Sequence, residues 1–119
     1  MIRHAALGGI VLAMLAGTPV SAADNGFTAK DLMDWCTAAS GTTEKTSCIL
    51  YVDGFVEAVA IAGGETNKLD ICLPPHFTVN EAIDVFVRQV RTDPALQRRE
   101  PGIALWPALE RSYPCIKPN

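Results

Sequence analysis

The sequence predicts an all-α fold, a small four-helix orthogonal bundle that is stapled by two disulfides. Two observations lead to this prediction. Apolar residues recur at helical spacing in four segments, and no convincing strand pattern lies between them. The chain has 119 residues and four cysteines, all of which follow an apparent export signal. An even number of cysteines in a short exported chain is typical of a disulfide framework.

Residues 1–23 have the features of a secretory signal peptide. A basic residue near the start is followed by an uncharged apolar run over 5–17, and small residues precede a cleavage point. A transmembrane anchor is the alternative, but a span needs about 20 apolar residues, and Thr18-Pro19 ends this run early. We therefore expect cleavage, export and a single helical domain over 24–119.

The composition limits the possible functions. The chain is 49% hydrophobic and 19% charged, with a formal net charge of −3. These values indicate one ordered domain and exclude a large enzyme, a nucleic-acid binder and a multi-pass membrane protein. The signal holds one of the ten basic residues and no acidic one, so cleavage changes the charge to −4. A chain of this size buries only about 60% of its unfolded surface, so disulfides or oligomerisation would help it fold.

The first predicted helix covers residues 29–39. Thr28 is in place to cap its N-terminus, with Asp31 three residues later. Phe27 and Leu32 have the spacing of a hydrophobic staple. A Ser-Gly pair then ends the helix.

The second predicted helix covers residues 47–62 and is apolar almost all round, with only Asp53 and Glu57 interrupting. Such a helix is normally buried on most sides. We expect it to be the central helix, or to face a second subunit as well. Gly54 in its interior costs about 1 kcal/mol relative to alanine, which favours a role in close packing.

The third predicted helix begins at the capping box Thr78 to Glu81 and ends before Asp93-Pro94. One face is apolar and the other is polar. The apolar face carries Val79, Ile83, Phe86, Val87 and Val90, and the polar face carries Asn80, Asp84, Arg88 and Arg91. Asp84 and Arg88 have the spacing of an ion pair.

The fourth predicted helix starts near Pro101, a residue type that suits the first turn. Its core side would carry Ile103, Trp106, Ala108 and Leu109. Pro107 is expected to kink or restart this helix, because proline has no N–H to donate. Tyr113-Pro114 ends it.

Three pairings of the four cysteines are possible. None of the cysteines forms a C-x-x-C motif, so neither thioredoxin-like chemistry nor a zinc ribbon is indicated. Cys36 and Cys48 would meet across a helical hairpin. Cys72 and Cys115 would meet if the third and fourth helices pack antiparallel. We favour these two pairs, and the other pairings stay open.

No catalytic constellation is evident. Asp53 and Glu57 would suit an acid–base pair, but they are more simply a solvated stripe. His76 is a lone loop histidine. The hydroxyls of Ser40, Thr42, Thr43, Thr46 and Ser47 fit loop and cap roles, and both tryptophans fall on core stripes. We expect no catalytic residue, no metal site and no cofactor, and so no enzyme.

Several motifs together resemble a known family. These are Cys36, the segment from Cys48 to Ala58 with Tyr51 and Gly54, Ile71-Cys72-Leu73-Pro74, and Tyr113-Pro114-Cys115. In this combination the chain is similar to the Rap/Tai family over about residues 32–115. Those proteins are immunity proteins of type VI secretion systems. The usual pattern has a continuous fourth helix, from which Pro107 departs.

The resemblance implies a helical, often dimeric protein of the periplasm. It implies that the chain binds a cognate peptidoglycan amidase toxin and blocks the active-site cleft of that toxin. The family fixes no contact residues by motif, so we expect them on protruding polar side chains with rigid support. The candidate partner-binding residues are Asn80, Asp84, Arg88, Arg91, Gln97, Arg98, Arg99 and Glu100.

Two other functions remain open from the sequence. A periplasmic stress chaperone would use the apolar second helix after a change of pH. A small-ligand carrier would use a pocket inside the bundle. A partner is expected to be basic, because the mature chain is acidic.

Overall fold

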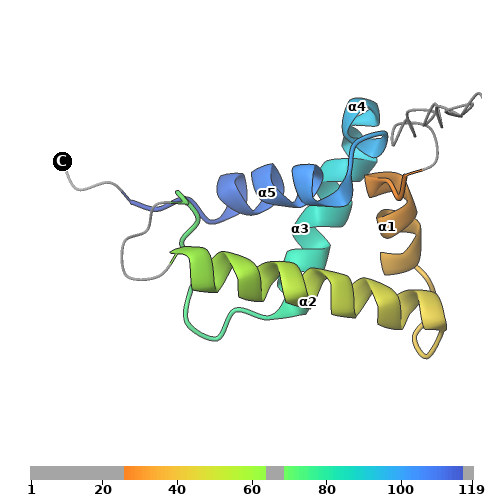
Figure 1. Ribbon diagram of the computed structural model, residues 1–119, viewed down its shortest axis with the longest axis horizontal. Coiled ribbons are helices and arrows are strands. Elements are labelled where there is room, and N and C mark those ends of the chain that lie inside the picture. The colour runs from red at the N-terminus through yellow and green to blue at the C-terminus, as the bar shows by residue number, and fades with distance from the viewer. Residues whose placement is uncertain (1–25, 64–68, 117–119) are drawn as a thin grey trace, which may run out of the picture.

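The computed structural model describes residues 26–63 and 69–116. This part of the chain forms five helices (Figure 1), with no strand among the described residues. They are α1 (Ala29–Cys36), α2 (Thr43–Gly63), α3 (Val79–Thr92), α4 (Pro94–Gln97) and α5 (Pro101–Ser112). The all-α prediction is confirmed, whereas the four-helix orthogonal arrangement is not. The predicted signal over 1–23 lies outside the described residues.

The α1 helix begins where its capping box predicts. The Asp31 N–H donates to the Thr28 hydroxyl at 3.3 Å, and the Asp31 carboxylate accepts from the Thr28 N–H at 2.8 Å. The helix ends three residues before the predicted end. The Thr37 hydroxyl and N–H both donate to the Met33 carbonyl, at 2.9 and 3.0 Å, and the Ala38 N–H then donates to the Trp35 carbonyl at 3.2 Å, three residues back instead of four. Lys45 Nζ of α2 satisfies the Cys36 carbonyl at 2.6 Å.

The α2 helix starts four residues earlier than predicted, because the Thr42 hydroxyl accepts from the Lys45 N–H at 3.2 Å. Only one side of α2 is buried, through residues such as Val52 and Val59. Leu50 is 67% exposed and Ile61 is 82% exposed. The prediction of a central helix buried on most sides within the chain is therefore wrong, because α2 packs on α1 and α3 from one side only. By length and composition alone, α2 would also be able to cross a membrane.

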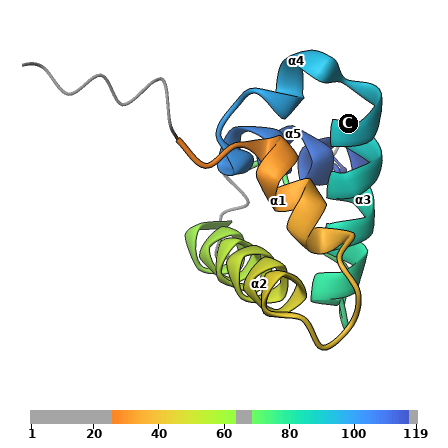
Figure 2. The same ribbon diagram turned by 90° about the vertical axis from the view of Figure 1, so that its right-hand side faces the viewer.

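The α3 helix is the centre of the fold instead. It packs against each of the other four helices, and Phe86 and Val90 on its inner face are completely buried. In Figure 2, α2 lies across one end of α1 and α3, and α4 lies at the other end. The outer face of α3 is thereby held on a fixed support.

The helix α5 continues through Pro107 without a break, so the predicted restart is wrong. Proline at this position leaves the Ile103 carbonyl without its helical donor. The residue that carries this carbonyl, Ile103, is 44% exposed. The short α4 was not predicted. It forms because the Asp93 carboxylate accepts from the Ala95 and Leu96 N–H groups at 3.0 and 3.3 Å.

Two disulfides close the fold, and they are the pairs favoured by the helix order. Cys36–Cys48 ties α1 to α2 with the Cα atoms 5.1 Å apart. Cys72–Cys115 joins the segment before α3 to the segment after α5, with the Cα atoms 4.9 Å apart. Beside this bridge the Cys72 N–H donates to the Tyr113 carbonyl at 2.8 Å, and Ile71 pairs with Pro114 in an isolated β-bridge.

The capping box of α3 predicts a pH dependence. The Thr78 hydroxyl and N–H donate to the Glu81 carboxylate at 2.8 and 2.7 Å, and these bonds lower the pKa of Glu81 below its usual 4.5. A lowered folded-state pKa stabilises the fold above the usual value, and this stability is lost as the pH falls through the folded pKa. Glu81→Gln should therefore remove part of the acid-induced loss of stability. Urea unfolding between pH 6 and pH 2 measures how much free energy of unfolding each protein loses in acid.

The matched control is Asp84→Asn, which removes an exposed carboxylate from the same helix but outside the capping box. We expect this control to lose stability in acid as much as the wild type does. Equal acid sensitivity of Glu81→Gln and Asp84→Asn would contradict the role of the capping box.

Candidate partner-binding surface

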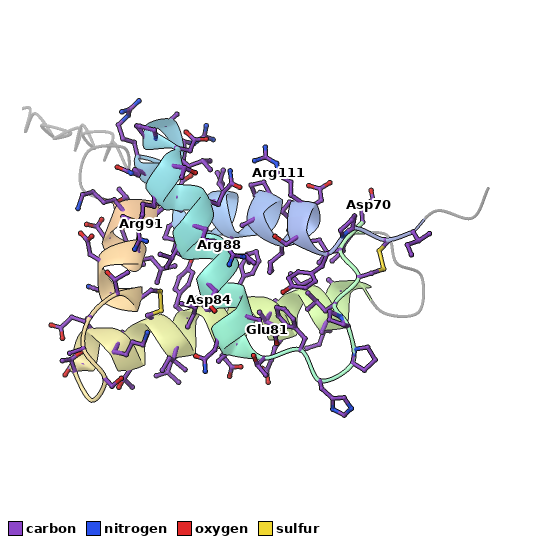
Figure 3. The ribbon with its side chains drawn as sticks, turned by 180° about the vertical axis from the view of Figure 1, so that it is seen from behind. Asp70, Glu81, Asp84, Arg88, Arg91 and Arg111 are labelled. Atoms are coloured by element: carbon purple, nitrogen blue, oxygen red, sulfur yellow. A yellow bond between two sulfur atoms is a disulfide. The ribbon has the colours of Figure 1, made fainter. Side chains whose placement is uncertain are left out.

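The polar side of α3 is solvent-exposed along its whole length. Asn80, Asp84, Arg88 and Arg91, here called the α3 charged face, are all exposed. Figure 3 shows Asp84, Arg88 and Arg91 along the side of α3 that faces the viewer, with Arg91 beside α1. The buried residues of α3 lie on its other side: Ala82, Ile83, Val85, Phe86 and Val90. The amphipathic pattern of the sequence thus places these four residues on one exposed surface.

The charges of this face are not neutralised by one another. Lys30–Asp34 on α1 is the ion pair found among the described residues, and Asp84 and Arg88 do not form the pair that their spacing predicts. Exposed helical ion pairs are worth only about 0.3–0.5 kcal/mol, so little stability is lost. Within the described part of the chain, both charges remain available to another molecule.

The tip beyond α4 extends this surface. The tip carries three of the candidate partner-binding residues, and all three are exposed: Arg98, Arg99 and Glu100. The Arg99 carbonyl accepts from the Ala29 N–H at 2.7 Å, which fixes the tip against the start of α1. A backbone that is already fixed loses less conformational entropy when the segment binds a partner.

Gln97 behaves differently from the other predicted contact residues. Its side chain is half-buried, and its Nε2 donates to the Val90 carbonyl at 3.1 Å. Gln97 therefore connects α4 to the end of α3 and is a supporting residue of the surface. This supporting role could not be predicted from the sequence, because α4 itself was not predicted.

Arg111 was missed by the sequence analysis. It lies in the last turn of α5 and is exposed, and Figure 3 shows it extending outward from α5, which packs on α3. Its place relative to α3 depends on that packing, so no spacing in the sequence signals it.

The remaining chemical candidates do not come together into a site. Asp53 and Glu57 are exposed on α2. His76 is exposed in a turn with a left-handed backbone (φ 64°). Trp35 and Trp106 pack against the core. Among the described residues, no three His, Cys, Asp or Glu side chains are placed to hold a metal ion.

The sequence itself relates the chain to known proteins. The profile of a family described as Rap1a immunity proteins matches residues 28–115. The chain belongs to this family. The match begins at the capping residue of α1 and ends at the last cysteine, so it includes all five helices and both disulfides of this Rap1a family member. No curated protein and no solved structure matches the chain.

Membership confirms the resemblance inferred from the cysteine and glycine motifs. An immunity protein neutralises a toxin by binding it, so the family implies a toxin protein as the partner of this chain. The exposed charges on α3 and at the tip fit such a role, because they lie on a rigid support and are free of one another.

Proposed function

We propose that this chain is a periplasmic immunity protein. It binds a peptidoglycan amidase that a type VI secretion system delivers, and it covers the active-site cleft of that enzyme. The family match over residues 28–115 carries this proposal. The exposed charges of the α3 charged face and the tip support the choice of contact surface.

The disulfides support the periplasm as the compartment. Bonds of this kind persist in oxidising compartments and are rare in the cytosol, and the described part of the chain has no free cysteine. The predicted signal over residues 1–23 supplies the route. Intact-mass measurement of protein from the periplasmic fraction tests whether cleavage occurs near residue 23.

Inhibition by this surface needs binding and no chemical step. Charged groups across an interface speed encounter and fix the register, and a few well-packed residues supply most of the affinity. Arg88, Arg91 and Arg111 would pair with acidic or carbonyl groups at the rim of the amidase cleft, and Asp84 would take a basic one. We further propose that the chain acts as a homodimer.

Co-expression tests the proposed function most directly. A candidate peptidoglycan amidase effector is directed to the periplasm, where it is expected to lyse cells that lack protection. We expect the full-length chain to restore growth and a variant without residues 1–23 to fail. Continued lysis despite folded, exported protein would overturn the amidase assignment.

Charge reversal tests the proposed surface. Asp84→Lys, Arg88→Glu, Arg98→Glu and Arg99→Glu each remove one exposed charge and introduce its opposite. We expect at least one of these changes to weaken amidase binding by about tenfold or more, equal to about 1.4 kcal/mol. The melting temperature should change little, because the side chains are exposed. Calorimetric titration gives the dissociation constant.

A matched control separates local contacts from net charge. Ala39→Glu/Thr43→Glu lowers the net charge by the same two units as Arg88→Glu, at exposed positions near the start of α2. Its affinity for the amidase should stay near that of the wild type. If all four reversals also bind normally, the surface lies elsewhere.

A further inference from the structure

We propose that the end of the molecule around α4 is a docking surface for an acidic region of the partner protein. This surface, here called the arginine end, consists of Arg88, Arg91, Arg98 and Arg99, the first two of which it shares with the α3 charged face. The inference rests on the proposed function, because it takes a protein as the partner, and it adds the chemistry that this partner presents. It replaces the expectation, drawn from the net charge alone, that the partner is basic.

The fold brings the two pairs of arginines to one end of the molecule. The Gln97 side chain donates to the Val90 carbonyl at 3.1 Å, which holds the residue before Arg98 against the residue before Arg91. The Arg99 carbonyl accepts from the first N–H of α1 at 2.7 Å, and Figure 3 shows Arg91 beside α1. Both pairs therefore stand on backbone that is fixed against its neighbours at the α4 end.

The four guanidinium groups have no partner within the described part of the chain. All four side chains are exposed, and none of them forms an ion pair or a hydrogen bond with another described residue. Both described lysines, by contrast, are engaged. Lys30 pairs with Asp34 at 2.6 Å, and Lys45 donates to the Cys36 carbonyl at 2.6 Å. The unpaired positive charge of the described chain is therefore carried by arginine, and four of the five described arginines lie at this end.

The acidic side chains close to these arginines do not cancel their charge. Asp93 is half-buried, and its carboxylate already accepts from the Ala95 and Leu96 N–H groups at 3.0 and 3.3 Å. Glu100 is exposed. Four arginines against these two acids give residues 88–100 a net charge of +2, on a chain whose net charge is −3. The arginine end is thus locally positive on a negative protein.

Negative charge lies at the opposite end of the bundle. The α2 helix carries Glu44, Asp53 and Glu57, all of them exposed, and in Figure 2 it lies across the end of α3 that is away from α4. The 14 residues of α3 span about 21 Å between these ends, which is more than twice the Debye length of about 8 Å at physiological ionic strength. A partner at the arginine end therefore meets the local positive charge, and the distant carboxylates of α2 are screened.

The use of arginine indicates which acidic groups fit. A guanidinium is planar and donates two parallel N–H bonds to one carboxylate, whereas a lysine ammonium acts as a point charge. A guanidinium is also less strongly hydrated than an ammonium, so it enters an interface more easily. Aspartate and glutamate side chains on the partner are therefore the groups that this surface binds.

A protein suits this surface better than an anionic membrane does. Binding in the plane of a membrane normally combines basic side chains with apolar ones that enter the lipid. Here the strongly exposed Leu50 and Ile61 belong to α2, at the other end of the molecule. The family match also implies a protein as the partner. The arginine end is thus assigned to a protein surface that is rich in carboxylates.

Two decapeptides of opposite charge test the surface without any toxin. The isotope-labelled mature chain, residues 24–119, is titrated at low salt with a glutamate decapeptide and, as the matched control, with a lysine decapeptide, and amide chemical shifts are followed by NMR. We expect the glutamate peptide to shift the amides of residues 88–100 and the lysine peptide to shift those of α2. A glutamate peptide that leaves residues 88–100 unshifted overturns the proposal.

Exposed-side-chain variants give the sign of the effect. Arg98→Gln/Arg99→Gln should weaken binding of the glutamate decapeptide by about threefold or more. Arg98→Lys/Arg99→Lys keeps both charges but not the planar group, so its affinity should lie between those of the wild type and the glutamine variant. Glu100→Gln should bind the peptide more tightly than the wild type, because it removes a repulsive charge. Equal losses in the glutamine and lysine variants, or weaker binding by Glu100→Gln, would contradict a surface built for carboxylates.

Failure of this proposal differs from failure of the proposed function. If the glutamate peptide binds at the arginine end but no amidase is neutralised on co-expression, the acidic-partner surface is supported and the amidase assignment is overturned. If an amidase is neutralised and binds the glutamine variant as tightly as the wild type, the function is supported and the arginine end is overturned. Flotation with phosphatidylglycerol vesicles, combined with no shift by the glutamate peptide, would assign the arginines to a lipid surface and also overturn the proposal.

Discussion

The double variant Cys72→Ser/Cys115→Ser should lose more stability than any other change that leaves the core intact. The bridge closes a loop of 43 residues, and the chain-entropy estimate for such a loop is about 4 kcal/mol. The Cys36–Cys48 bridge spans 12 residues, for which the same estimate is about 3 kcal/mol. Since small domains are stable by only about 5–15 kcal/mol in total, both effects are large.

Urea unfolding at pH 7 measures the two double-serine variants side by side. The order of the two stability losses is a sharper test than the size of either loss, because the entropic estimate depends on the state of the unfolded chain. Each variant keeps the other disulfide and so serves as its control. A Cys36→Ser/Cys48→Ser variant that loses more stability than Cys72→Ser/Cys115→Ser would show that local packing outweighs loop closure.

The local features of this fold were predictable because they depend on neighbouring residues. The capping boxes of α1 and α3 each need only a threonine and an acidic residue three positions later. The amphipathic pattern of α3 fixed its inner and outer faces. The bridge between Cys72 and Cys115 followed once α3 and α5 were assumed to pack antiparallel, because that packing brings the start of one helix beside the end of the other.

The predictions that were wrong or missing concern features that depend on tertiary packing. The α2 helix is apolar almost all round, so its sequence does not distinguish an inner side from an outer side, and the exposure of Leu50 and Ile61 follows only from the position of its neighbours. Asp93-Pro94 ends α3 and also begins α4, and only the first role was predicted. The helix continues through Pro107, and the residue whose carbonyl loses its helical donor, Ile103, is itself exposed.

In the candidate surface, too, some residues were predictable from local spacing and others depend on tertiary packing. The four residues of the α3 charged face were found from helical periodicity alone. The place of Arg111 relative to α3 depends on the packing of α5, which no sequence spacing encodes. The hydrogen bond from Gln97 to the Val90 carbonyl could not be predicted, because the two residues are seven positions apart on different helices.

Phe86→Ala should lower the free energy of unfolding by about 3–5 kcal/mol, the range for a buried phenylalanine replaced by alanine. Phe86 is completely buried on α3, and its removal leaves a cavity among the helices that α3 holds together. Phe77→Ala is the control, because Phe77 is only half-buried and makes an edge-on contact with Tyr113. Its loss should be clearly smaller. Equal losses would contradict the central place of α3.

Phe86→Ala also tests how far the proposed binding surface depends on the core. The α3 charged face is rigid only because the opposite side of the helix is anchored in the core. At low temperature, where Phe86→Ala is still folded, we expect amidase affinity to fall less than in the most affected charge-reversal variant, since every contact side chain is retained. At a temperature where Phe86→Ala is half unfolded, its apparent affinity should fall in proportion to the folded fraction. An affinity loss at low temperature as large as that of the charge reversals would mean that Phe86 positions the surface as well as stabilising the fold.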